Sequence, residues 1–158
     1  VNFKNNSTAP TWSTANNGKT EFIPGTGYLV AYEAANPTKI FQGTFNSGTV
    51  NFALTYGGQS TYKYFNLVGN PYPCTIDWKA ASGWNRSNLV ENGSGNYDYW
   101  IWNDAVGNYG VFNSGGADGS GTNSVSRYIA TGQGFYVLAK QSGPFVIDNG
   151  VKAQSPQK

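Results

Sequence analysis

The stretch NLVGNPYPCTIDW at residues 66–78 decides the fold of this chain. It begins as an apolar β-strand that ends at Val68. The pair GN at residues 69–70 breaks the strand, because both residues tolerate positive φ. Pro71 and Pro73 follow, and each fixes φ and removes a backbone donor. We therefore expect the chain to leave one sheet here and cross to another.

The composition is typical of an all-β protein rich in turns. The 158 residues include 21 glycines, 16% aromatic residues and only 11% charged residues, against about 25% charged residues in an average domain. Apolar segments alternate with Gly-, Pro- and Asn-rich turns at about the 8–12-residue spacing of sandwich strands, with no long helical pattern between them. We expect a single antiparallel β-sandwich, jelly-roll-like, with long Gly/Asn-rich loops.

Length and charge narrow the class of protein. We expect one domain over residues 1–158, with a weakly structured start over 1–20 and a tail over 154–158, as a monomeric piece of a larger chain. The net charge of +2 comes without a basic cluster, which argues against nucleic acid. No apolar run approaches membrane-spanning length. The low charge and many Asn, Ser and Thr residues fit a secreted or cell-surface protein.

Several strands are predicted individually. We expect strands at residues 28–32, 62–68 and 135–139, and a hairpin over 40–54 whose strands flank the loop 46–48. The strongest signal is YDYWIW at residues 97–102, where aromatic and β-branched residues are concentrated.

A Gly-x-Gly-aromatic pattern occurs twice. PGTGYLVA at residues 24–31 is echoed by TGQGFYVLA at residues 131–139. A phosphate-binding loop would need a strand before the glycines and a helix after them, and neither is predicted. We interpret both motifs as corners at which a strand enters the core with close backbone approach.

These motifs together resemble a known family. FIPGTGYLV, FQGTFNSG, NLVGNPYP, YWIWN and YIATGQGFYV follow one another in that order between about residues 20 and 150. The chain thus resembles the β-rich modules near the C-terminal end of large secreted Bacteroidetes proteins, which often precede a type IX secretion sorting domain. Cys74 departs from the serine usual there. The resemblance implies secretion and a modular parent. It implies no activity, although some parents degrade polysaccharides.

The residue types in the chain argue against a catalytic site or a metal site. The chain has no histidine and one cysteine, Cys74, which removes Ser/His/Asp and Cys/His arrangements, common zinc sites and an internal disulfide. Its eight acidic residues show no recognisable pairing of the kind a glycosidase needs. We expect no enzyme activity and no cofactor. Calcium at residues 118–123 is the one metal candidate, but a flexible loop is favoured there.

The aromatic residues suggest a binding function. Aromatic rings stack on the CH-rich faces of sugars, while neighbouring polar side chains bind the hydroxyl groups. The first candidate site lies on the connection after residues 66–78. Its five residues are Asp77, Trp78, Trp84, Asn85 and Arg86.

The second candidate site is in the strand at residues 97–102. Side chains alternate along a strand, so Asp98, Trp100 and Trp102 share one face. Either this face is an exposed aromatic platform, with Tyr99 in the core, or the tryptophans are in the core. The second alternative, with the tryptophans in the core, is favoured, because buried tryptophan is normal in β-sandwiches.

We therefore expect a non-catalytic carbohydrate-binding module whose partner is a polysaccharide or cell-surface glycan. The alternative is a structural spacer or adhesion module without glycan binding, in which all the aromatic residues pack into the core or turns. A glycan-active enzyme is the least favoured function.

Overall fold

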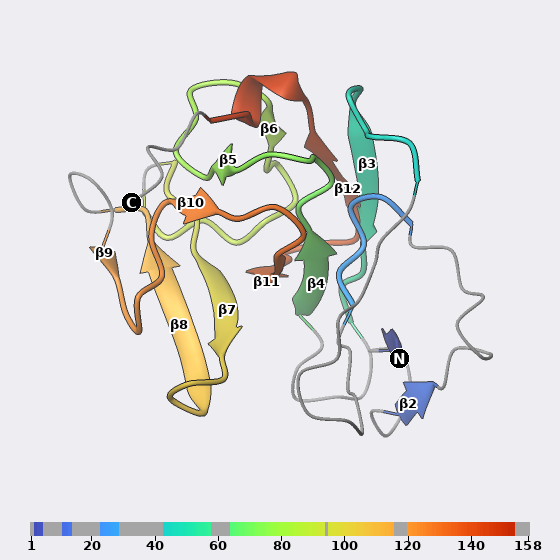
Figure 1. The fold of residues 1–158 in the computed structure, drawn as a ribbon. Helices are drawn as coiled ribbons and strands as arrows, with labels where there is room; N and C mark the ends of the chain where they lie inside the picture. The colour runs from blue at the N-terminus through green and yellow to red at the C-terminus, as the bar shows by residue number, and fades with distance from the viewer. Residues whose placement is uncertain are drawn as a thin grey trace.

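The protein has an all-β fold in the computed structural model, which describes residues 2–4, 11–13, 23–28, 43–57, 64–93, 95–115 and 120–153 (Figure 1). The strands are β1 (Asn2–Lys4), β2 (Thr11–Ser13), β3 (Val50–Leu54), β4 (Phe65–Gly69), β5 (Ile76–Asp77), β6 (Trp84–Asn85), β7 (Tyr99–Asn103), β8 (Asn108–Asn113), β9 (Ser120–Gly121), β10 (Tyr128–Ile129), β11 (Gly134–Leu138) and β12 (Gly143–Ile147). A 3-10 turn, η2 (Asn149–Val151), follows β12.

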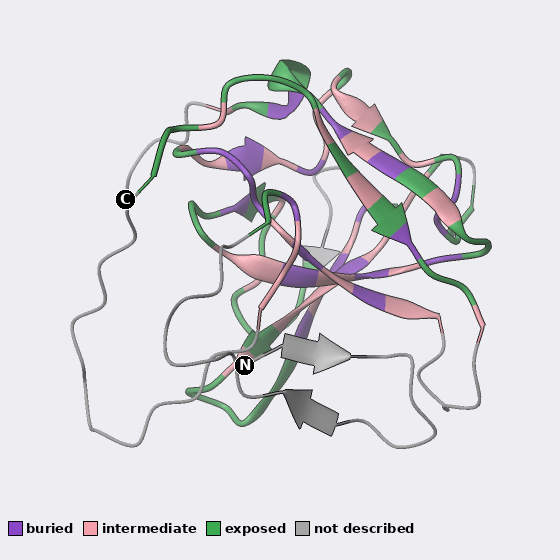
Figure 2. Ribbon diagram, turned by 90° about the vertical axis from the view of Figure 1, so that its right-hand side faces the viewer, coloured by how far each residue is buried: buried purple, intermediate pink, exposed green. Residues whose placement is uncertain are grey.

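The strands form antiparallel sheets that pack around one core. The largest sheet has the order β4-β11-β7-β8-β9, and a second has the order β3-β12-β6. β5 pairs with β10, and β1 pairs with β2. The expected antiparallel β-sandwich is confirmed. Residues on the strands alternate between buried and more exposed positions, as the changing colours along the ribbons in Figure 2 show.

The crossing between sheets after β4 is confirmed. β4 belongs to the five-stranded sheet, whereas β5 pairs with β10. Asn70, which is 8% exposed, holds the corner. Its side-chain nitrogen donates toward the carbonyl oxygens of Cys74 at 2.8 Å and Ala130 at 3.0 Å, and its side-chain oxygen accepts from the Tyr72 N–H at 3.0 Å. This buried amide is therefore bonded at both ends, as buried polar groups require.

The two Gly-x-Gly motifs lie on opposite sides of β4. Val68 pairs with Thr26 on one side and with Phe135 on the other. A Cβ atom added to Gly27 would lie 2.5 Å from Leu67 Cγ, and one added to Gly69 would lie 2.8 Å from the Thr26 carbonyl oxygen. The close approach expected of the first motif is thus present. In the second motif a Cβ atom on Gly134 would make only an ordinary contact, 3.5 Å from Leu67 Cδ1, and one on Gly132 would meet nothing within 4 Å, so the tight approach expected there is wrong. Both motifs adjoin the same strand.

The predicted hairpin over residues 40–54 does not form as expected. Residues 43–49 contain no strand, and β3 pairs with β12 over its whole length. The pairing with β12 brings Phe145 and Ile147, both fully buried, into the core, and this tertiary packing outweighs the local turn signal. Residues 40–42 lie outside the described residues, as do residues 29–32 of another predicted strand and the predicted tail.

Trp78 occupies the centre of the core, between the two larger sheets. Its ring lies 5.2 Å from Tyr99 and 5.8 Å from Phe135, which belong to the five-stranded sheet. On the other side it lies 4.8 Å from Trp84 and 6.4 Å from Phe145, which belong to the three-stranded sheet. The largest side chain of the connection after β5 thus joins the two layers.

Candidate functional site

The first predicted site is mostly interior, and the placement of Trp78 at the surface is wrong. Trp78 has no exposed surface. Its backbone N–H donates to the Arg127 carbonyl at 2.8 Å and its indole N–H to the Tyr97 carbonyl at 2.7 Å. Pairing of β5 with β10 turns the following residue inward, so the corner delivers this ring to the core.

Trp84 and Arg86 pack against Trp78. Trp84 is half-buried, stacks on Phe145 at 5.7 Å with an interplanar angle of 17°, and donates its indole N–H to the Asp77 carbonyl at 2.9 Å. The Arg86 guanidinium lies 4.3 Å from the Trp78 ring and 4.8 Å from the Trp84 ring, and it donates to the Trp78 carbonyl. Burial lowers the pKa of Arg86 to about 10. These contacts are those of a core boundary, not of an open binding surface.

Asp77 forms an ion pair, and Asn85 is the exposed member of the group. Arg127 donates through Nε to one Asp77 oxygen at 2.8 Å and through a terminal nitrogen to the other at 2.5 Å. The Lys79 N–H adds a third bond to the carboxylate at 2.8 Å. The side-chain oxygen of Asn85 accepts from the Ser87 N–H at 3.2 Å. Of the five residues of the first site, only Asn85 is exposed.

The orientation of β7 corrects the expectation of core tryptophans. Tyr99 is fully buried, whereas Trp102 on the opposite face is 45% exposed and Trp100 is half-buried against Phe65, at 5.2 Å. The Tyr99 hydroxyl donates to the Ser126 carbonyl, so the polar end of this core ring has a partner. The platform alternative therefore describes the strand, with its two tryptophans on the outer face.

Three aromatic rings on the outer face form what we call the outer aromatic row: Trp102, Tyr109 and Tyr136. They come from β7, β8 and β11, and in the sheet β7 lies between β11 and β8. The rings of Trp102 and Tyr109 are 5.1 Å apart, and those of Tyr109 and Tyr136 are 5.7 Å apart. Burial, together with the charge of Tyr109 and a hydrogen bond to it, raises the pKa of Tyr136. Trp102 and Tyr109 remain 45% and 42% exposed.

Asp98 is not joined to this row by any described contact. It is half-buried, and one of its carboxylate oxygens accepts from the side-chain nitrogen of Asn92 at 2.8 Å. The other oxygen is buried and has no hydrogen-bond partner among the described residues. The alternation that predicted a shared face with Trp102 therefore does not bring the carboxylate into the row.

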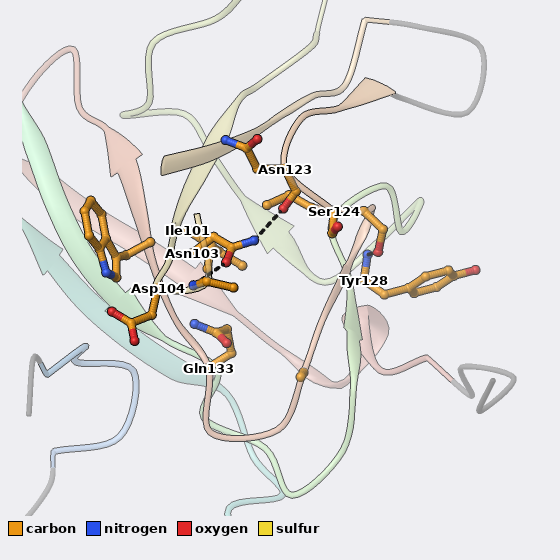
Figure 3. A pocket seen from close by; sticks show the side chains of 12 residues that line it. Ile101, Asn103, Asp104, Asn123, Ser124, Tyr128 and Gln133 are labelled. Atoms are coloured by element: carbon orange, nitrogen blue, oxygen red, sulfur yellow. Dashed lines mark hydrogen bonds between the residues drawn. The ribbon is translucent and has the colours of Figure 1, made fainter. Parts of the chain in front are cut away.

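Trp102 also borders a cavity of about 410 Å³, which we call the end cavity. It lies where the β7–β8 turn meets the loop before β10 and the turn before β11 (Figure 3). Its lining residues are Ile101, Trp102, Asn103, Asp104, Ala105, Asn123, Ser124, Val125, Ser126, Tyr128, Ala130 and Gln133. In Figure 3 the Tyr128 ring points away from the lining amides, so Trp102 is the ring that links cavity and row.

The rim of the end cavity is held in a strained backbone conformation. Asn123 and Ser124 have φ values of 50° and 66°, which non-glycine residues rarely adopt. The side-chain nitrogen of Asn103 donates to the Asn123 carbonyl at 3.0 Å, as the dashed line in Figure 3 shows. The side-chain nitrogen of Asn123 in turn donates to the Tyr109 carbonyl at 2.9 Å. Such strain persists where the surroundings enforce it, and it is concentrated at functional sites.

Sequence reasoning found Trp102 and missed the other residues of this region. The tyrosines of the row could have been found from strand alternation, once Tyr99 was assigned to the core. Asp104, Asn123 and Gln133 come from three separate turns, and no local pattern marks them as neighbours.

The described residues hold neither a clustered metal site nor a membrane-spanning helix. They contain no group of three or more Cys, Asp or Glu side chains placed to hold a metal ion. Residues 118 and 119 of the calcium candidate lie outside the described residues. No described helix is long and apolar enough to cross a membrane.

Comparison with known proteins gives one match. A family model with the description "Domain of unknown function (DUF8693)" matches residues 2–158. No curated protein matches the chain. No solved structure matches it.

Proposed function

The chain belongs to the family of domains of unknown function DUF8693, and we propose that it is a non-catalytic module that binds glycans at the outer aromatic row and the end cavity. One observation carries the proposal: Trp102, nearly half exposed, belongs both to a row of touching aromatic rings and to a cavity lined by amide side chains. Ring faces stack on sugar rings, and amides bind hydroxyl groups.

The shape of the site supports a ligand of several sugar units. A cavity of about 410 Å³ falls in the usual size range of small-molecule sites. The row continues from Trp102 on β7 to Tyr109 on β8, whose ring also lies against Tyr136 on β11. A glycan chain could thus place one end in the cavity and further units along the row. Secretion within a larger chain, as the sequence resemblance implies, belongs to the same proposal.

Binding without catalysis is supported by the small number of carboxylates that line the end cavity. Asp104 is the only acidic side chain among the residues that line the end cavity. Hydrolysis of a glycosidic bond normally uses two carboxylates about 5–9.5 Å apart. The site therefore offers contacts to a sugar but lacks the usual acid and nucleophile or base.

Affinity electrophoresis tests this function. The chain is run toward the cathode, because its net charge is +2, through native gels that contain one soluble polysaccharide each, with insoluble glycans tested by pull-down. We expect retardation by at least one glycan and its loss in Trp102→Ala. Phe45→Ala removes a ring that is 79% exposed and belongs to neither the row nor the cavity, and it should retain retardation.

Two results would contradict the proposal. Wild-type protein that no glycan retards would leave the spacer or adhesion function as the better account. Release of reducing sugar from any glycan in the panel would show catalysis.

A further inference from the structure

The end cavity offers a ligand hydrogen-bond acceptors as well as donors. Asn103 is occupied at both ends, because its nitrogen donates to the Asn123 carbonyl and its oxygen accepts from the Ala105 N–H at 3.0 Å. The side-chain nitrogens of Asn123 and Gln133 donate to the backbone carbonyls of Tyr109 and Gly134. No described residue donates to the amide oxygens of Asn123 and Gln133. The Ser124 hydroxyl and the Trp102 indole N–H add donors. A fitting ligand therefore both donates and accepts, as sugar hydroxyl groups do.

The charge of the cavity favours a ligand without negative charge. Its lining residues include the exposed carboxylate of Asp104 and no Lys or Arg. Arg127, next in sequence to two lining residues, is held in the bidentate ion pair with Asp77. A uronate or sulfate group entering the cavity would face Asp104 without a lining cation to neutralise it, and such like-charge contacts select against a partner.

The angles between the rings favour a single chain over a crystalline surface. Trp102 and Tyr109 meet at 74°, and Tyr109 and Tyr136 meet at 83°. Neighbouring rings are thus nearly perpendicular and offer no common plane for the flat face of a packed polysaccharide. A single chain can turn successive sugar units to meet each ring.

We propose that the site selects uncharged glycans and binds them as single soluble chains. The selection follows from the lining of the cavity, which carries the Asp104 carboxylate and no cation, and from the perpendicular rings of the row. This inference rests on the glycan binding proposed above and specifies its ligand class.

Calorimetric titration of the full chain with hexasaccharides tests the inference. The neutral probes are cellohexaose, maltohexaose and hexa-N-acetylchitohexaose, the acidic probe is hexagalacturonate, and microcrystalline cellulose is the surface probe. We expect at least one neutral hexasaccharide to bind, and hexagalacturonate to bind at least about tenfold more weakly than the best neutral probe. Binding to microcrystalline cellulose should be undetectable.

Each contrary outcome has a separate meaning. Hexagalacturonate that binds as tightly as the best neutral probe, with the affinity lost in Trp102→Ala, would overturn the inference and leave glycan binding at this site in place. Binding to microcrystalline cellulose without binding to soluble cellohexaose would do the same. A chain that binds no hexasaccharide and no polysaccharide of the panel would overturn both proposals.

The variant Asp104→Asn tests whether charge causes the preference for neutral glycans. The variant removes the charge and retains the shape of the side chain, so the preference for neutral over acidic hexasaccharide should shrink by about threefold or more. Asp98→Asn is the matched control, because Asp98 is bonded to Asn92 and does not line the cavity, and it should leave the preference unchanged. An unchanged preference in Asp104→Asn would contradict the electrostatic origin of the selectivity.

Discussion

The two faces of strand β7 carry the same kinds of side chain and have opposite roles. On the inner face, Tyr99 is fully buried beside Trp78. On the outer face, Trp102 is 45% exposed and touches Tyr109. Residue type therefore does not assign an aromatic ring to the core or the surface of this protein. The register of the strand between its two neighbours makes that assignment.

The polar ends of the rings differ in the same way. Trp78 and Tyr99 each donate to a backbone carbonyl inside the fold, so each buried donor is satisfied. No described residue accepts from the Trp102 indole N–H. The inner rings use their hydrogen-bonding capacity for stability, whereas the outer tryptophan leaves its own available to a ligand.

Trp78→Ala should produce the largest loss of stability. It removes the ring that contacts both larger sheets, and truncation of a buried tryptophan costs about 3–5 kcal/mol. Urea unfolding followed by far-UV circular dichroism measures the change. A loss below about 1 kcal/mol would show that the inner cluster is not the centre of the core.

Alkaline pH should weaken the fold through its buried tyrosines. Burial, and secondarily the negative charge of Asp77, raises the pKa of Tyr99 above its ordinary value of 10. The unfolded chain releases this proton above about pH 10 while the folded chain retains it. Stability therefore falls as the pH rises past 10, by up to about 1.4 kcal/mol per unit for this one group.

Tyr99→Phe separates this effect from other titrations. The lowered pKa of Arg86 acts in the opposite direction, because the folded chain gives up that proton before the unfolded chain does. Arg86 is present in both proteins, so it cancels in their difference. Urea midpoints between about pH 9 and pH 11 should fall less steeply for the variant. Parallel slopes would contradict the assignment to Tyr99.

Ser124→Gly should have the smallest effect on stability and probes the rim of the end cavity. Ser124 has a φ of 66°, a conformation that glycine adopts without steric cost. We expect the free energy of unfolding to change by only about 0.5 kcal/mol, in the stabilising direction. Urea unfolding measures it. A loss above about 1 kcal/mol would mean that the conformation is not strained.

The fold was largely predictable, because its signals are local. The prolines after β4 predicted the crossing between sheets, and the Gly-x-Gly motifs predicted close backbone approach at Gly27. The prediction of a hairpin over residues 40–54 was wrong, because the partner of β3 is the distant strand β12. Turn chemistry is local, whereas the choice of a strand partner depends on which residues the core needs.

The candidate site was less predictable. Alternation correctly limited β7 to two orientations, but sequence could not choose between them, since tyrosine and tryptophan both fit a core or a surface. The end cavity combines Asp104, Asn123 and Gln133 from separate turns. Only the paired register of β7 and β8 and the contacts between these turns bring them together.

The most direct test of the outer face as a glycan site is a calorimetric comparison of Trp102→Ala with Phe45→Ala on whichever neutral hexasaccharide the wild-type chain binds best. Loss of one stacked ring should weaken binding at least about tenfold, while the unfolding midpoint stays close to that of the wild type. Phe45→Ala should bind like the wild type. Equal binding by Trp102→Ala and the wild type would contradict the assignment of the outer aromatic row as the binding site.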